Sequence, residues 1–424
     1  MTSRERLAAA LDHREADRVP LDLGATPVTG ISASALSRLR LALGLDRPGD
    51  RVRVIEPYQM LGEVTDDLRE ALGIDTVGIG ARTGFFGFEN RDWQEWELFD
   101  GTPVLVPGAF NTRPEANGDI LQYPEGDRSV PPSGRMPNGG YYFDSIIRQE
   151  PIEDSALNPE DNLQEFQPVT EDDIAYFGAT SEALWSSGEY ALVANFGGTG
   201  LGDIALVPAP FLKHPRGIRD VEEWYVSTVS RRDYVLAVFE RQCEIALQNL
   251  PRLAAAVGDR VQVVMMTGAD FGTQRGPFIS VETYRNLYKP FHEALNAWVH
   301  QNTKWKTFMH TCGGVLPLIP DFIEAGFDIL NPAQCSAEGM SARHLKNEFG
   351  AHLTFWGGAV DTQQTLPFGT PEEVRREVLD RLEVFAPGGG FVFNTIHNIQ
   401  PRTPVENLLA VFEALRDFNA GLSP

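Results

Sequence analysis

Short apolar runs rich in β-branched and aromatic residues recur along the chain, separated in the later half by longer helix-like segments. Most of these runs are continuous rather than alternating, as parallel strands buried on both faces require. Eight are readable: Val19–Leu23, Thr76–Ile79, Ala191–Phe196, Val261–Met266, Thr307–His310, Asp328–Asn331, His352–Trp356 and Phe391–Asn394. Eight strands alternating with helices predict an α/β fold, a closed (β/α)8 TIM barrel, with a doubly wound sheet as the alternative.

Helical patterns fill the spaces between the later runs. They are predicted at Val281–Gln301, Val315–Ala325, Ser341–Phe349 and Pro371–Phe385. The last begins with a cap signature: Thr370 stands at the N-cap, proline follows at the first helical position, and Glu372 and Glu373 lie in the first turn. Strand–helix alternation through this half is typical of a parallel sheet.

The segment Gly84–Asn158 breaks the alternation because it is rich in glycine, proline, asparagine and aromatic residues. Turn signals at Phe99-Asp100-Gly101 and Asn117-Gly118-Asp119 predict hairpins. We interpret the segment as a β-rich insertion after strand 2, lying across the barrel mouth or along its side. The chain is expected to form a single barrel domain over residues 1–424 that carries this insertion at residues 84–158.

The charge balance restricts the partners. There are 36 basic and 59 acidic residues among 424, which gives a net charge of −23. Such a field repels nucleic-acid backbones and anionic lipid surfaces, so neither is expected as a partner. A homodimer is compatible with this net charge.

The cysteines and the first residues indicate a cytoplasmic protein. Three cysteines in a long chain do not make a disulfide framework, and they fit a reducing compartment. The first twenty residues read as a charged amphipathic helix without the apolar centre of a signal peptide. No stretch approaches the roughly 18–20 apolar residues that span a bilayer.

Candidate chemistry gathers at the carboxyl ends of the predicted strands, where barrel enzymes place their sites. Asp22 lies at the end of the first strand and Asp270 follows the fourth. Asp270 would orient a substrate or accept a hydrogen bond from a ligand histidine; the alternative is an aspartate that caps loop amides. Gly197–Gly202 resembles a phosphate loop but fits the dinucleotide pattern poorly, so we expect a substrate loop there.

The run His310-Thr311-Cys312, followed by two glycines, is the sharpest signal. Residues i and i+2 of an extended chain point to the same side, so imidazole and thiolate project together. This pairing suits zinc rather than magnesium or calcium. A buried structural cysteine beside a hydrogen-bonded histidine is the alternative. A third ligand is required, and Cys335 after strand 6 and His397 after strand 8 are the candidates.

Several short sequence motifs resemble those of the uroporphyrinogen decarboxylase superfamily. They are Arg4–Leu11 with Asp17–Pro20, the run His310-Thr311-Cys312-Gly313, and the ending Thr370–Val374, Gly388–Gly390 and Pro401–Leu408. The chain looks most like the zinc-dependent branch that moves methyl groups to or from corrinoid proteins, coenzyme M or related thiols. True decarboxylases carry an arginine-rich N-terminal segment that grips porphyrinogen carboxylates, whereas this chain reads Leu21-Asp22-Leu23-Gly24-Ala25-Thr26 there.

The resemblance also bears on the third ligand. The methyltransferases carry a cysteine just before the motif that matches Pro401–Leu408. The corresponding position here, counted back from Thr403-Pro404, is His397. It therefore favours His397 over Cys335. One thiolate fewer leaves zinc a stronger Lewis acid, which favours a methyl donor bound through oxygen or nitrogen.

The expected function is therefore zinc-dependent methyl transfer from a small O- or N-methyl compound to a corrinoid protein, or between corrinoid and a thiol. Two alternatives remain. One is a metal-independent decarboxylase-like lyase acting on a small carboxylated substrate, in which Asp22 or Asp270 stabilises a cationic intermediate. The other is a non-catalytic binding barrel with a structural His–Cys pair.

Overall fold

The computed structural model describes residues 1–197 and 201–421. Its largest sheet contains seven strands, and every adjacent pair in it is parallel. In spatial order the strands are β14 (Phe391–Val392), β13 (Thr354–Trp356), β12 (Ile329–Asn331), β11 (Lys306–His310), β10 (Val261–Thr267), β9 (Ala191–Ala194) and β3 (Thr76–Ile79). Neighbours in space follow one another in sequence, without the order reversal of a doubly wound sheet, so the sheet curls as in a TIM barrel. The fold prediction is confirmed.

The predicted first strand, Val19–Leu23, is reduced to a single bridge. Leu21 forms an isolated parallel bridge with Phe393. Its carbonyl accepts the backbone N–H of Asp75 at 2.8 Å, just before β3. This segment therefore fills the gap between β14 and β3. Pro20 lacks an N–H and Gly24 has φ of +85°, so a longer regular strand cannot form here.

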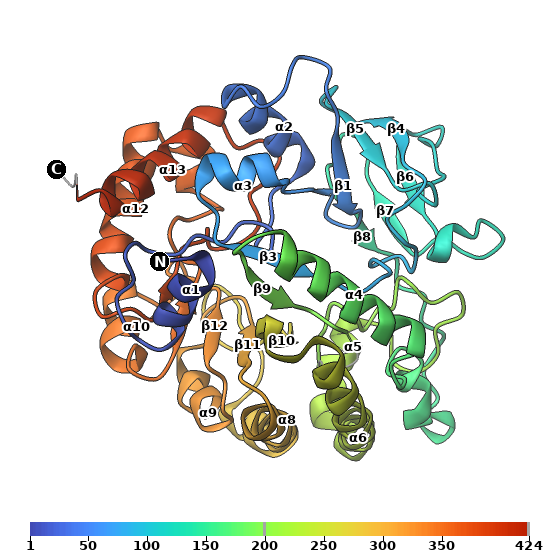
Figure 1. The fold of residues 1–424 in the computed structure, drawn as a ribbon. Coiled ribbons are helices and arrows are strands. Elements are labelled where there is room, and N and C mark those ends of the chain that lie inside the picture. The colour runs from blue at the N-terminus through green and yellow to red at the C-terminus, as the bar shows by residue number, and fades with distance from the viewer. Residues whose placement is uncertain (198–200, 422–424) are drawn as a thin grey trace.

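The helices surround the curled sheet, as Figure 1 shows. They are α1 (Ser3–Leu11), α2 (Ala33–Ala42), α3 (Asp66–Leu72), α4 (Glu171–Ser187), α5 (Val221–Ser230), α6 (Arg232–Val257), α7 (Val281–Thr283), α8 (Lys289–Asn302), α9 (Ile319–Glu324), α10 (Ala342–Phe349), α11 (Thr365–Phe368), α12 (Pro371–Phe385) and α13 (Val405–Asn419). Thr370 caps α12 by accepting the backbone N–H of Glu373 at 3.3 Å, as the sequence predicts. None of the helices in the described ranges is long and apolar enough to cross a membrane.

Two predicted helices are interrupted at prolines. The segment Val281–Gln301 contains a π-helical stretch, Tyr284–Tyr288, between α7 and α8. Pro290 stands in the first turn of α8 and has no N–H to continue a regular ladder. Similarly, a 3-10 turn at Leu316–Leu318 precedes α9.

The predicted insertion forms two small sheets at one side of the barrel (Figure 1). One has the order β2-β1-β5-β4, from β1 (Val52–Glu56), β2 (Leu61–Gly62), β4 (Gln94–Glu97) and β5 (Pro103–Val106). The other has the order β6-β7-β8, from β6 (Ile120–Gln122), β7 (Gly134–Met136) and β8 (Asp144–Ser145). The first sheet therefore recruits residues 52–62, which the sequence analysis did not assign to strands.

One of the two predicted hairpins is present. Gly101, with φ of +81°, lies in the turn between the antiparallel strands β4 and β5. The second prediction is wrong. Gly118 makes a turn that leads into β6, but the antiparallel partner of β6 is β7, reached after residues 123–133. A short turn signal reports the local backbone and not which strands pair beyond it.

The two N-terminal motifs, Arg4–Leu11 and Asp17–Pro20, contact one buried carboxylate, that of Asp75, just before β3. Asp75 is 0% exposed. Its side chain forms ion pairs with Arg6 at 2.5 Å and Arg18 at 2.9 Å, and it accepts the backbone N–H of Leu21 at 2.9 Å. Arg6 also pairs with Asp17 at 2.7 Å. These ion pairs and hydrogen bonds therefore hold the N-terminal segment against the amino ends of the barrel strands, opposite their carboxyl ends.

Candidate metal centre

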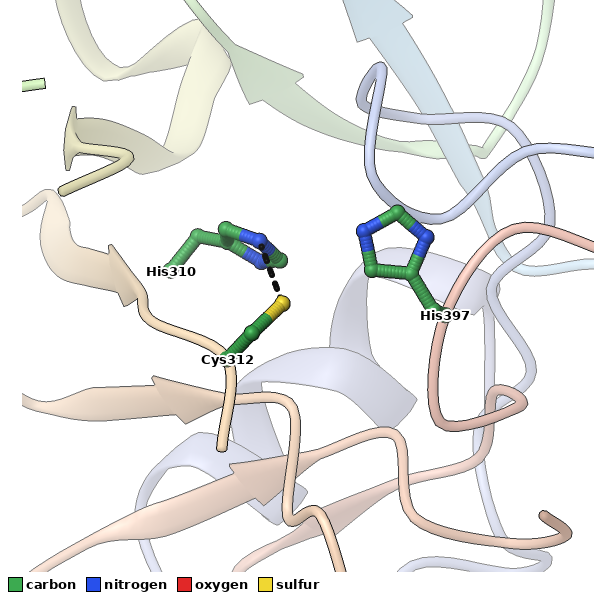
Figure 2. A group of neighbouring side chains, drawn as sticks. All are labelled: His310, Cys312 and His397. Atoms are coloured by element: carbon green, nitrogen blue, oxygen red, sulfur yellow. Dashed lines mark hydrogen bonds between the residues drawn. The ribbon is translucent and has the colours of Figure 1, made fainter. Parts of the chain in front are cut away.

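His310 is the last residue of β11, and Cys312 lies two residues beyond it. Both side chains project into the same space, as Figure 2 shows. The Cys312 Sγ and the His310 Nε2 are 3.4 Å apart. The side-by-side projection expected for residues i and i+2 is therefore present in the folded chain.

Asn331, at the end of β12, fixes which nitrogen of His310 carries the proton. Its amide nitrogen donates to the carbonyl of Trp356 at 2.8 Å, so its Oδ1 must face the histidine. That oxygen lies 2.6 Å from the His310 Nδ1, which therefore donates. The His310 Nε2 keeps its lone pair and faces Cys312. A hydrogen bond of this kind orients a metal-binding histidine.

Close backbone packing places Cys312. Gly313 has φ of +89°, and a Cβ built on it would lie 2.3 Å from the Gly272 carbonyl carbon. A Cβ on Gly272 would lie 2.6 Å from the Cys312 carbonyl oxygen. Only glycines allow the two loops to approach so closely. The backbone N–H of Cys312 also donates to Asp270 Oδ1 at 2.6 Å. The loop after β10 therefore holds the loop after β11.

His397 comes from the loop after β14 and approaches from the other side (Figure 2). Its ring centroid is 5.5 Å from that of His310. Its Nδ1 accepts the backbone N–H of Asn398 at 2.8 Å, so the proton of the neutral ring lies on Nε2. His397 differs in this from His310, because its Nε2 can bind a metal only after the ring proton moves to Nδ1 and the hydrogen bond from Asn398 is broken.

The donor set fits zinc. The ligand atoms of His310, Cys312 and His397 all lie within 4.8 Å of one another. Bonds of tetrahedral zinc to sulfur and nitrogen hold those atoms about 3.5 Å apart. The His310–Cys312 separation already matches this edge, and His397 needs only a small approach. Two imidazoles and one thiolate leave a fourth position for a substrate, as in catalytic zinc sites.

The surroundings keep the metal-free group uncharged. Burial, and after it the charge of Asp270, raises the pKa of the Cys312 thiol well above its usual value. Burial, followed by the neighbouring His310, lowers the pKa of His397 to about 4. A thiol and a neutral imidazole therefore face each other at neutral pH, and a bound cation would stabilise the thiolate.

Two aspartates flank the group. Asp270 Oδ1 lies 3.8 Å from the His310 Nε2, and it caps the Cys312 amide as the alternative interpretation has it. Asp203, which the sequence analysis missed, follows β9 and accepts the backbone N–H of Ala205 at 2.9 Å. Burial, with Asp270 nearby, raises the pKa of Asp203 to about 6. Its position soon after a strand end is the signal that could have found it. Of the expected substrate loop Gly197–Gly202, residues 198–200 lie outside the described residues.

The other candidates lie apart from this group. Asp22 is 0% exposed and accepts hydrogen bonds from Thr76 at 2.6 Å and from the Trp356 indole at 2.8 Å. These contacts suit a structural group that joins the first segment to β3 and β13, and its catalytic role stays a prediction. Cys335 packs against the hydrophobic core outside the three-residue group. Burial raises the pKa of its thiol to about 11.

Residues 215–418 match the sequence model of the uroporphyrinogen decarboxylase family. A uroporphyrinogen decarboxylase of Coxiella burnetii (strain Dugway 5J108-111) is 41% identical over 49 residues, 12% of this chain and 14% of that protein. The enzyme of the same name from Pseudoalteromonas translucida (strain TAC 125) is 44% identical over 52 residues, 12% of this chain and 15% of that protein. These alignments therefore span only a small part of each relative.

The solved structure of a methyltransferase from Methanosarcina mazei is similar over the whole length. The two chains superimpose with a TM-score of 0.53 at 16% identity, covering 99% of each. At this identity the likeness establishes the fold. The family match includes His310, Cys312 and His397, and excludes Asp22 and the two small sheets. Residues 215–418 are thus similar to the uroporphyrinogen decarboxylase family, and the chain as a whole has the same fold as the Methanosarcina mazei methyltransferase.

Proposed function

We propose that this protein is a zinc-dependent methyltransferase. Its methyl donor is a small compound with an oxygen- or nitrogen-bound methyl group, and its acceptor is the corrinoid of a partner protein. The observation that carries the proposal is the convergence of His310, Cys312 and His397 within 4.8 Å at the carboxyl end of the barrel strands. The name of the Methanosarcina mazei structure supports the transferase class.

Each residue has a defined task in this proposal. Asn331 holds the His310 ring with its Nε2 lone pair toward the site. Asp270 fixes the backbone of Cys312 and places a carboxylate beside the group. His310, Cys312 and His397 would hold the zinc, which would supply Lewis-acid stabilisation of charge on a leaving heteroatom.

The composition of the ligand set favours a donor whose methyl group is bound to oxygen or nitrogen. A set of two histidines and one cysteine carries one negative charge fewer than a set with two cysteines. The metal is then a stronger electrophile, which suits a donor whose oxygen or nitrogen departs with an electron pair. A thiol acceptor would profit more from a thiolate-rich site.

The decarboxylase-like alternative has less support. A carboxylated substrate needs cationic side chains to hold it. Arg6 and Arg18, in the N-terminal motifs that resemble the superfamily, are already paired with Asp17 and Asp75. They are fastened at the opposite end of the barrel from His310.

Methylation of free cob(I)alamin tests the proposal, because its visible absorption changes when methyl binds. The zinc-loaded protein is assayed with methyl ethers and methylated amines as donors. Activity should fall at least about a hundredfold in His310→Ala and Cys312→Ala, which lose groups that bind the metal. His344→Ala, on the exposed face of α10, is the matched control and should keep full activity.

Two results would contradict the proposal. One is full methylation activity in metal-free protein. The other is release of carbon dioxide from a carboxylated substrate that survives Cys312→Ser, since the decarboxylase-like alternative needs no metal.

A further inference from the structure

A cavity of about 340 Å³ lies where the insertion meets the loop that carries His397. The insertion contributes Tyr142 and Asp144, the loop after β1 contributes Tyr58, and the loop after β14 contributes Asn398 and Gln400. Pockets of this size accommodate small organic molecules. Asn398 directly follows His397 and donates its backbone N–H to that ring, so one loop contributes both to the cavity wall and to the candidate metal centre.

The cavity wall carries negative but no positive charge. No lysine or arginine lines it within the part of the chain that the structure describes. Asp144 is exposed, and it takes part in none of the ion pairs formed among the described residues. Its charge acts on Tyr58, whose pKa is raised first by burial and then by Asp144. An anionic ligand would be repelled here.

The wall also offers aromatic rings and amide groups. Tyr142 is 51% exposed, so its ring is accessible to a ligand. Tyr58 is fixed by a hydrogen bond with Ser145 at 3.0 Å and by packing on Phe85, with ring centroids 4.7 Å apart. Accessible tyrosine rings beside a free carboxylate are the chemistry that recognises methylated ammonium groups.

We propose that this cavity binds a small methylated ammonium cation. Its role as the site of the methyl donor rests on the proposed function, whereas the binding itself does not. The rings contact the methyl groups, Asp144 balances the charge, and the amide oxygen of Gln400, whose nitrogen already donates to the Asn398 carbonyl, accepts a hydrogen bond from a polar tail. Asn398, which lines the cavity, follows His397 in the same loop.

Calorimetric titration with three probes of nearly equal shape tests the charge preference. They are choline, its uncharged carbon analogue 3,3-dimethylbutan-1-ol, and the anion 3,3-dimethylbutyrate. Choline should bind about tenfold more tightly than the alcohol, and the anion most weakly. Equal binding of choline and the alcohol, tighter binding of the anion, or no binding of choline would overturn the proposal.

Variants locate the bound cation. Tyr142→Ala and Asp144→Asn should each weaken choline binding about five- to tenfold, and Asp144→Glu should restore part of it. Tyr141→Ala is the matched control, because Tyr141 does not line the cavity and packs instead under Arg402, 5.4 Å away. Choline binding that is unchanged in both Tyr142→Ala and Asp144→Asn places the cation elsewhere and refutes the assignment.

The same titration separates this inference from the proposed function. In His310→Ala and Cys312→Ala the cavity wall is intact, so choline binding should persist while methyl transfer is lost. If wild-type protein binds choline in the cavity but methylates no corrinoid, the proposed function fails and the binding site stands. If methyl transfer occurs and choline does not bind, the cavity assignment fails alone.

Discussion

Asn331 accepts a hydrogen bond from His310, with 2.6 Å between its Oδ1 and the histidine Nδ1. The other face of the same amide donates to the Trp356 carbonyl, which prevents it from turning over. The neighbouring strands β11, β12 and β13 together therefore decide that the His310 Nε2 faces Cys312 with a free lone pair. A hydrogen bond that holds Nδ1 and leaves the Nε2 lone pair free is the arrangement that a metal-binding histidine requires.

Removing the acceptor should weaken zinc binding. Asn331→Leu leaves the His310 ring free to rotate, and we expect the zinc affinity to fall about 10–100-fold, measured by competition with a chelator. Asn331→Asp keeps the acceptor oxygen for His310 but loses the donor to the Trp356 carbonyl, so it should retain only part of the affinity. Equal affinities of wild type and Asn331→Leu, with both folded by circular dichroism, would contradict this role.

The approach of Gly272 to the Cys312 loop gives a second prediction. A Cβ on residue 272 would lie 2.6 Å from the Cys312 carbonyl oxygen, so Gly272→Ala must displace that loop. We expect a loss of stability of about 1–3 kcal/mol and weaker zinc binding. Gly80→Ala is the control, because nothing lies within 4 Å of its added carbon. Unchanged zinc affinity in Gly272→Ala would show that the loop position is not critical.

Asp75 is predicted to hold the N-terminal segment in place. Asp75→Ala leaves Arg6, which is 6% exposed, without its most buried partner. Breaking such a pair costs about 3–5 kcal/mol, which urea unfolding would detect. Zinc binding should be unaffected in the protein that remains folded. A loss below about 1 kcal/mol would place this ion pair among weak surface pairs.

Buried histidines make the stability of the metal-free protein depend on pH. Burial lowers the pKa of His292 to about 3 and that of His397 to about 4, whereas an unfolded histidine titrates near 6.5. Between about pH 6.5 and 4 the unfolded chain binds more protons, so stability should fall as the pH falls. His292→Phe should flatten this dependence in urea unfolding, while the exposed-site change His344→Ala should not. The same slope in His292→Phe and wild type would contradict the assignment.

The sequence was most informative where one strand or helix acts alone. Continuous apolar runs predicted the strands of the main sheet, and the Thr370 cap predicted the start of α12. The spacing of His310 and Cys312 predicted their shared direction. Each of these features depends on backbone periodicity within a few residues.

Features that depend on distant parts of the chain were not predicted. β1 pairs with β5, some fifty residues later, and local composition does not indicate that pairing. The orientation of His310 depends on Asn331 and Trp356, and Asp203 joins the site through a loop of another strand. The resemblance already favoured His397 over Cys335, and of these two the folded barrel brings only His397 together with His310 and Cys312.

Zinc content per chain tests the central claim most directly. Mass spectrometry of the purified protein after exhaustive dialysis should find about one zinc per chain, lost in His310→Ala, Cys312→Ala and His397→Ala. Cys335→Ala should retain the metal, because this cysteine lies outside the group. Full zinc content in the His310→Ala and Cys312→Ala variants, or zinc lost from Cys335→Ala and kept in His397→Ala, would contradict the account.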